Sequence, residues 1–165
     1  MEHETMITGK RITKKVLFSK TVEILQPILQ LDDWRILVTY SRTMKKTDVA
    51  SCQSWPEYKQ AKIRLNLKRL KEFNDYEVIS AAIHEMLHCI TWPLAEWAEQ
   101  LCKKDAQKLE LTRKLDEGLV TNLEKILGQL CKELVQTELK SQGYCDLDLT
   151  FENFDVKFEQ VRKKR

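Results

Sequence analysis

The sequence of 165 residues has few residues that interrupt regular structure, with three prolines and four glycines, and it contains no internal repeat. It also lacks a run of about 18 apolar residues, so no transmembrane helix and no membrane partner are expected. The beginning of the chain lacks the continuous apolar stretch of a signal peptide. We therefore expect a cytoplasmic protein, or one that acts in the cytoplasm of a host.

The cysteines follow no recognisable pairing pattern. There are five, an odd number, and no two of them form a Cys-x-x-Cys motif, so a zinc ribbon or zinc finger is not expected. Cys89, Cys102 and Cys131 fall among apolar residues in helix-like stretches, where a free thiol behaves as a small hydrophobic side chain. This usage favours a reducing compartment.

Charge of one sign is not in large excess, because the formal net charge is only +3, which is too small to require a nucleic acid as partner. With 42% hydrophobic and 32% charged residues, the composition is typical of a soluble globular domain that can bury a core. Basic residues concentrate at 9–15 and 161–165. These ends are either solvated termini or a weak electrostatic tether to nucleic acid or another acidic partner.

Three segments have the composition and alternation of strands. Residues 34–40 (WRILVTY) are rich in β-branched and aromatic side chains, and residues 49–55 (VASCQSW) form a weaker candidate closed by Pro56. Residues 61–67 (AKIRLNL) alternate between apolar and polar side chains, which predicts a half-buried strand.

Helices are expected on both sides of these strands. Residues 19–31 have a helical apolar pattern capped by Ser19 or Thr21, although Pro27 should kink or split it. After the strands, Asn74 and Glu77 have the spacing of a capping box at the start of a helix that we expect Pro93 to end. The apolar face expected for this helix comprises Val78, Ile79, Ala82, Ile83, Met86, Leu87 and Ile90.

Two further helices are expected beyond Pro93, the first over residues 94–109. The inward face of the second is expected to comprise Leu115, Leu119, Leu123, Ile126 or Leu127, Leu130 and Leu134. The order of elements predicts an α+β domain over residues 19–138, with a basic arm at 1–18 and an extension at 139–165. Within that extension the segment LDLTFENFDVKF alternates and is a candidate strand.

The most informative segment is HEMLH, which comprises residues 84–88 on the predicted helix. Positions i and i+4 lie on the same helical face, so the imidazoles of His84 and His88 can hold one metal ion. Glu85 is offset around the helix, where it can reach a water molecule on that ion. Two histidines, one further protein ligand and an open position for water suit a catalytic Zn²⁺.

A third protein ligand is needed, and no further histidine follows HEMLH. We expect it to be a carboxylate on a later helix, and Glu117 is the first choice because it lies 29 residues after His88, enough for the chain to turn and return. Its rivals are Asp116, Glu124 and Glu110, whereas Glu96 and Glu99 follow Pro93 too closely to be first choices.

The chain resembles the small zincin-fold metallopeptidases of phages and mobile elements, and in particular a minimal gluzincin. The resemblance rests on HEMLH, on the pairing of WRILVTY with YKQAKIRLNL, and on DEGLVTNLEKIL, and it covers roughly residues 20–130. It implies a zincin-like fold and a zinc-dependent peptidase. His84, His88 and Glu117 would bind the Zn²⁺ and Glu85 would be the general base. The SprT-like proteases share this plan but use a third histidine, which is absent here.

The resemblance also implies how a peptide or protein substrate would bind. The strand that contains Ile63, Arg64, Leu65 and Asn66 would line the cleft and pair with an extended substrate, as in β-augmentation. No residue can be assigned to stabilise the oxyanion, and Tyr58 and Tyr144 are candidates by residue type alone.

Two other interpretations remain open at this point. The zincin fold could be a weakly active or inactive binding module with a structural metal, contacting nucleic acid through its basic termini. Alternatively, His84 and His88 are partly buried residues of an inert helical core that bind no metal. The sequence does not indicate an oligomeric state.

Overall fold

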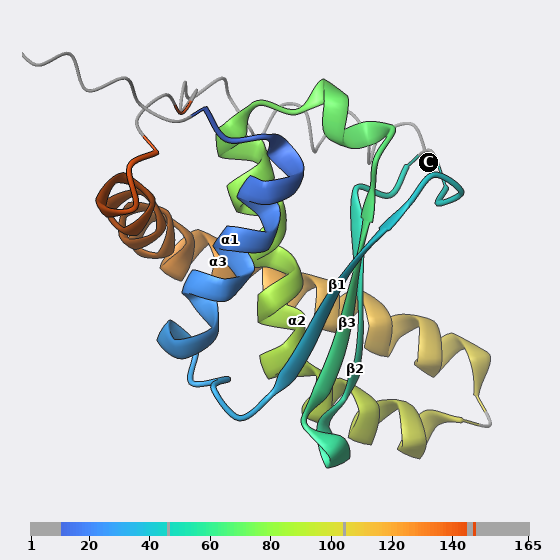
Figure 1. Cartoon of the computed structure of the whole chain (residues 1–165). Coiled ribbons are helices and arrows are strands. Elements are labelled where there is room, and N and C mark those ends of the chain that lie inside the picture. The colour runs from blue at the N-terminus through green and yellow to red at the C-terminus, as the bar shows by residue number, and fades with distance from the viewer. Residues whose placement is uncertain (1–10, 46, 104, 145–146, 148–165) are drawn as a thin grey trace, which may run out of the picture.

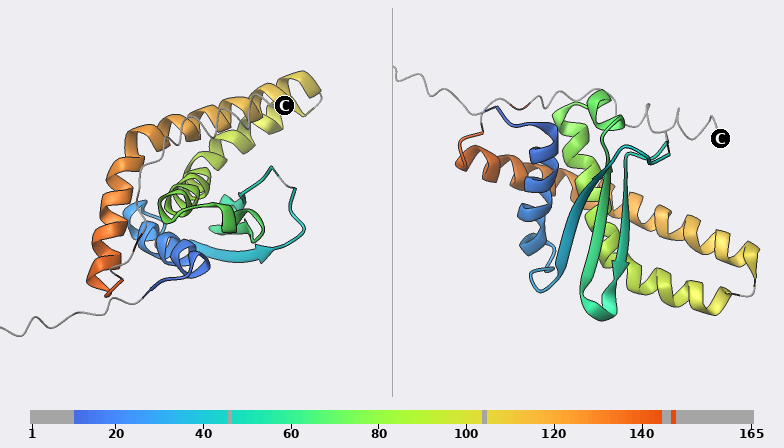
Figure 2. Two further views of the ribbon diagram at one scale, coloured as in Figure 1. Left: turned by 90° about the horizontal axis from the view of Figure 1, so that it is seen from above. Right: turned by 45° about the vertical axis from the view of Figure 1, so that its right-hand side comes forward.

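The computed structural model describes residues 11–45, 47–103, 105–144 and 147, and within them the chain has the expected mixed α+β architecture. Helices cover one face of a small sheet (Figures 1 and 2). The main elements are α1 (Lys14–Ile28), β1 (Arg35–Ser41), β2 (Ala50–Trp55), β3 (Gln60–Asn66), α2 (Asp75–Cys102) and α3 (Ala106–Ser141). Two short 3-10 helices, η1 (Pro56–Tyr58) and η2 (Arg69–Glu72), flank β3.

The sheet has the strand order β1-β3-β2. Val38 of β1 and Cys52 of β2 lie on opposite sides of Ile63 in β3, with β1 parallel and β2 antiparallel to it. The alternation of β3 arises because Ala61, Ile63 and Leu65 point into the core. The three predicted strands are confirmed to within one residue at each end.

The position of β3 corrects one expectation. Both edges of β3 are hydrogen-bonded to neighbouring strands, so its backbone has no free edge and the predicted pairing with a substrate is wrong. Ile63, Leu65 and Asn66 are buried, and only Arg64 among the four expected substrate contacts is exposed. The amide of Asn66 donates to the carbonyls of Lys45 and Asp48, so its role is to hold the loop before β2.

The first helix begins earlier than expected. α1 starts at Lys14 within the predicted basic arm, and its cap is Thr13, whose hydroxyl accepts a hydrogen bond from the Val16 amide. The proposed caps Ser19 and Thr21 lie inside the helix instead. Pro27 does not split α1, because the helix ends one residue later.

The predicted start of α2 is confirmed. Asn74 and Glu77 form a reciprocal capping box, with a hydrogen bond of 2.8 Å in each direction. The apolar face that follows is fully buried except at its end, where Ile90 is exposed. This face, which includes Met86 and Leu87 of HEMLH, packs against α1 and leaves His84 and His88 on the opposite side of the helix.

Pro93 does not end α2, contrary to expectation, and the helix continues to Cys102. The separate helix expected over 94–109 does not exist, because its first half belongs to α2 and its end to α3. α2 bends partway along its length (Figure 1), and a proline is the usual cause of a bend within a helix. The bent end of α2 runs beside the beginning of α3.

α3 is one long helix that crosses the expected domain boundary at residue 138. Most of the leucine stripe expected to face inward is exposed, with Leu115 and Leu130 at 65% and 57% exposure, so the expectation is wrong there, whereas Leu123 and Leu127 do pack against the core. The buried positions are instead Val120, Gly128, Cys131, Lys132, Val135 and Leu139. Lys132 is satisfied in the core by its hydrogen bond to the Tyr76 hydroxyl.

The expected C-terminal strand lies outside the described residues, apart from its beginning at Leu147. None of the helices in the described ranges is long and apolar enough to cross a membrane.

Candidate metal centre

A cleft of about 960 Å³ lies between β2, α2 and the first half of α3. α2 contributes His84, Glu85 and His88 to its lining, and α3 contributes Asp116, Glu117, Gly118 and Glu124. On the strand side the lining residues include Ser51 and Cys52 of β2. The HEMLH motif therefore lies at the base of an open cleft and not inside a closed helical core.

Three potential metal ligands converge in this cleft. The Nε2 atoms of His84 and His88 each lie 3.7 Å from a carboxylate oxygen of Glu117, the first from Oε2 and the second from Oε1. One ligand atom from each residue can be chosen so that all three lie within 4.8 Å of one another. Ligands about 2.0–2.1 Å from a tetrahedral Zn²⁺ are roughly 3.3 Å apart, so small side-chain movements suffice to bind one ion.

Each imidazole is held in place by a second carboxylate. Nδ1 of His84 lies 3.2 Å from Glu124 Oε2, and Nδ1 of His88 lies 3.2 Å from Asp116 Oδ2. A carboxylate on Nδ1 fixes the ring orientation and leaves Nε2 to face the ion, which is the arrangement found at protein zinc sites. Both carboxylates are largely buried, with side-chain exposures of 17% for Glu124 and 13% for Asp116.

α3 supplies these carboxylates from a single helical face. Glu117, Val120 and Glu124 are separated by three and four residues, so they lie on the same side of the helix. Continuing this spacing leads to the buried positions Gly128 and Cys131. The face of α3 that packs on α2 is therefore acidic near HEMLH and apolar further along.

The carboxylates create an environment that favours positive charge. Burial alone would lower the pKa of His84, but its contacts with Glu117 and Glu124 outweigh burial and raise that pKa to about 10. The hydrogen bond with His84 lowers the pKa of Glu117 in turn. Burial acts to raise the pKa of Asp116, but its interactions, led by that with His88, hold the pKa below its ordinary value. The same carboxylates would stabilise a bound cation electrostatically.

Glu85 lies beside the ligands but is not one of them. It is only 7% exposed, and burial raises its pKa to about 6, although the two neighbouring histidines partly oppose that increase. An interaction with the backbone amide of Cys52 also acts to lower this pKa, which places β2, an edge strand of the described sheet, next to the carboxyl group. A carboxyl group with a pKa near neutrality can accept and return a proton.

The structure brings together the three residues expected as ligands. Asp116 and Glu124 contact Nδ1 of the histidines, on the side of each ring away from Glu117, and so are not placed as the third ligand. Glu110 and Glu99 line the outer cleft, where Glu99 forms an ion pair with Arg113.

The two tyrosines considered for the oxyanion do not line the cleft. Tyr58 lies in η1 and is 67% exposed, and Tyr144 follows the end of α3. Within the described ranges, the cations that line the cleft are Arg113 and Lys114. These two residues were not identified from the sequence, because the neighbouring residues do not indicate that this part of α3 borders the cleft.

A thiol pair next to the centre was also missed. The sulfur atoms of Cys52 in β2 and Cys89 in α2 lie 3.6 Å apart. Their mutual hydrogen bond, together with burial, raises the pKa of Cys52, so its thiol stays protonated. This contact between the two thiols joins β2 to α2 at Cys89, the residue that follows His88. The two cysteines are 37 positions apart, so only the fold could reveal the pair.

Comparison of the chain with protein-family models, curated proteins and solved structures finds no match. The assignment of this centre therefore depends on its own geometry.

Proposed function

We propose that the protein is a zinc-dependent peptidase of the zincin type. The observation that supports this most directly is the convergence of His84, His88 and Glu117 in an open cleft, next to the buried carboxyl group of Glu85. The donor set of two imidazoles and one carboxylate fits Zn²⁺ and leaves a coordination position open. When bound, a zinc ion would lower the pKa of a water molecule and polarise a substrate carbonyl.

The residues around the ligands have distinct roles in this proposal. Glu85 accepts a proton from the attacking water and delivers it to the leaving amine, for which its pKa of about 6 is suited. Asp116 and Glu124 hold the imidazoles through Nδ1. Arg113, which lines the same cleft and pairs with Glu99, is a cation that a substrate carboxylate or a developing negative charge would draw from that ion pair.

The substrate edge in this proposal is β2 instead of β3. Among the described residues β2 pairs with β3 on one side only, and its residues Ser51 and Cys52 line the cleft beside Glu85. An extended peptide pairing with this free edge would place a backbone carbonyl near the ligands. The relevant substrate class is therefore an unfolded or extended segment of a polypeptide.

Metal content and peptidase activity should be measured on the same variants. We expect about one zinc per chain in the wild type and a loss of zinc in His84→Ala and in Glu117→Ala. Glu85→Gln should retain the zinc and lose cleavage of an unfolded protein substrate by at least about 100-fold, because the general base is removed. Glu96→Gln, the same change on the same helix but outside the cleft lining, is the matched control and should keep both properties.

The alternative of a structural metal in a binding module gives a different result. In that case Glu85→Gln would leave every measured property unchanged, because a structural site needs no base. Wild-type protein that binds no zinc after reconstitution would exclude both the peptidase and the structural metal.

A further inference from the structure

A second hollow in the surface has a different chemistry from the metal cleft. It has a volume of about 840 Å³ and is lined by Lys14, Arg42, Leu67, Lys68, Leu70 and Lys71. It shares no lining residue with the metal cleft. Four of its six lining residues are cationic and none is acidic, which is the opposite of the charge in the cleft.

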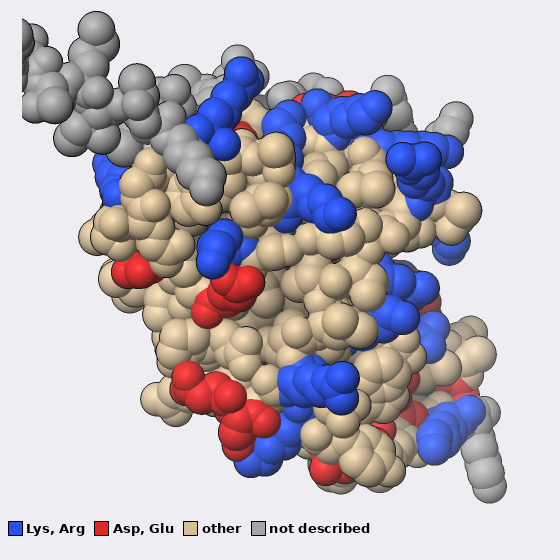
Figure 3. Space-filling view, viewed as in Figure 1, with Lys and Arg blue, Asp and Glu red and all other residues tan. Residues whose placement is uncertain are grey.

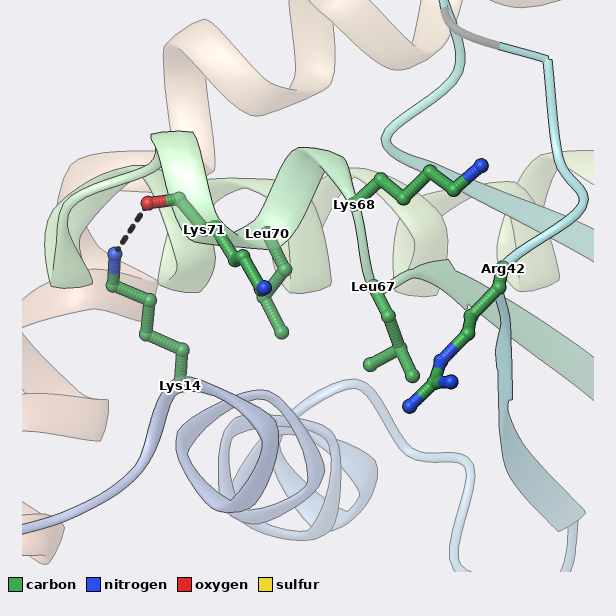
Figure 4. Close-up of a pocket in the computed structure, with 6 residues that line it drawn as sticks. All are labelled: Lys14, Arg42, Leu67, Lys68, Leu70 and Lys71. Carbon is green, nitrogen blue, oxygen red and sulfur yellow. Dashed lines mark hydrogen bonds between the residues drawn. The ribbon is translucent and has the colours of Figure 1, made fainter.

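Three parts of the fold meet at this basic hollow. Lys14 is the first residue of α1, Arg42 follows the end of β1, and residues 67–71 connect β3 to α2. Figure 4 shows Leu67 and Leu70 pointing into the space above the first turns of α1, with the guanidinium of Arg42 beside Leu67. The hollow therefore has an apolar wall with cations around it.

The cations of this hollow are not neutralised within the described part of the chain. Lys14 donates a hydrogen bond of 3.2 Å to the Lys71 carbonyl, which positions its ammonium without cancelling its charge. None of the described ion pairs involves Arg42, Lys68 or Lys71. The nearby Glu72 instead pairs with Arg69.

Positive charge extends beyond the hollow along the same end of the molecule. Lys45 is exposed in the loop after β1, and its carbonyl accepts a hydrogen bond from Asn66 at the end of β3, so this loop lies against the same end of the sheet. Figure 3 shows Lys and Arg side chains gathered over the upper part of this face, above most of the acidic ones. A surface of this extent suits an anion with several charges better than a single phosphate ion.

We propose that this basic hollow, together with Lys45, binds the phosphate backbone of a nucleic acid. Long cationic side chains that form no ion pair among the described residues are suited to neutralise phosphates, and such binding is independent of base sequence. Proteins hold single strands in basic grooves that follow the backbone, and the concave shape of this hollow fits a flexible single strand better than a stiff duplex. This site is independent of the metal centre, and of the basic ends at 9–15 and 161–165 it includes only Lys14.

Fluorescence anisotropy with a labelled single-stranded oligonucleotide tests the proposal on the full chain. The test variant is Arg42→Gln/Lys68→Gln, because both residues are exposed and neither side chain takes part in a described ion pair. We expect its affinity to fall at least about 10-fold. The slope of log affinity against log salt should become shallower by about 0.7 for each phosphate that is no longer neutralised.

The matched control is Lys125→Gln/Lys140→Gln, which removes the same charge from exposed positions on α3. Its affinity should change by less than about 3-fold, and Glu85→Gln should bind like the wild type. Equal losses in the two double variants would overturn the proposal, because only net charge would then matter. It would also be overturned if removal of residues 161–165 abolished binding while Arg42→Gln/Lys68→Gln had no effect. Equally tight and equally variant-sensitive binding of an acidic peptide would likewise reject nucleic acid as the partner.

Discussion

At the residue scale, the metal centre depends on side chains that lie behind the ligands. The imidazoles of His84 and His88 can present Nε2 to one ion only if both rings stay in their present rotation. Glu124 and Asp116 fix that rotation by contacting Nδ1 at 3.2 Å. From the sequence, both carboxylates were rival ligands, and their types and spacing did place them near the site. Only the packing of α3 on α2 shows that Glu117 faces Nε2 of both histidines as a ligand would, whereas Asp116 and Glu124 position the rings.

These two positioning carboxylates should control the affinity for zinc. Asp116→Asn and Glu124→Gln should each weaken zinc binding about 10- to 100-fold, because a neutral amide holds the imidazole less firmly and reduces its basicity. Competition with a chromophoric chelator measures this affinity directly. Glu133→Gln, on the exposed face of the same helix, is the control and should bind zinc like the wild type. If Asp116→Asn released zinc as completely as His88→Ala, Asp116 would itself be a ligand.

At the element scale, local patterns predicted the strands but not their order. β1 and β3 were recognised from β-branched residues and alternation, which depend on neighbours a few positions away. The order β1-β3-β2 depends on contacts between distant segments and places β3 in the centre. This is why Arg64 and its neighbours were assigned to the substrate edge, a role that we now assign to β2.

The helices show the same division between local and distant information. The start of α2 at Asn74 is a local hydrogen-bond pattern and was predicted. Its continuation through Pro93 was not, because a proline disfavours a helix locally while the packing of α2 on α3 compensates. In α3 the leucines suggested the buried face. The face turned towards α2 is actually the one with Glu117, Val120 and Glu124, of which Val120 is buried and Glu117 stays 56% exposed at the cleft. Its polar members concealed it.

The capping box makes a testable contribution to the element that carries HEMLH. Asn74→Ala removes the oxygen that accepts the Glu77 amide and should lower the free energy of unfolding by about 1 kcal/mol. Urea denaturation monitored by circular dichroism measures this loss. Asn74→Ser, which restores an acceptor at the cap, should recover most of it. Equal stability of the Ala and Ser variants would show that the cap contributes nothing to α2.

At the scale of the whole molecule, opposite charges occupy separate surfaces. Glu85, Asp116, Glu117 and Glu124 concentrate negative charge in the cleft between α2 and α3. The basic hollow lies where β1 ends and α1 begins. The small net charge of +3 is therefore the sum of an acidic surface at the cleft and a basic surface at the hollow. Each surface suits a different ligand, a divalent cation in the cleft and a polyanion at the hollow.

The cleft lies between elements that are distant in sequence, and this has a consequence for stability. His84 and His88 are on α2 whereas Glu117 is on α3, so one ion would link the two helices. A ligand that binds only the folded state stabilises it by about 2.7 kcal/mol at a free concentration one hundred times its Kd. For a domain of this size, that corresponds to an increase in Tm on the order of 5–10 °C.

We therefore expect saturating zinc to raise the Tm of the wild type by that amount and a chelator to reverse the increase, as measured by differential scanning fluorimetry. His84→Ala should show no increase, because a ligand is missing. Asn74→Ala is an informative control, since it should lower the Tm with and without zinc while preserving the difference between them. An increase in His84→Ala equal to that of the wild type would mean that zinc acts elsewhere on the chain, and the link between α2 and α3 would then have to be abandoned.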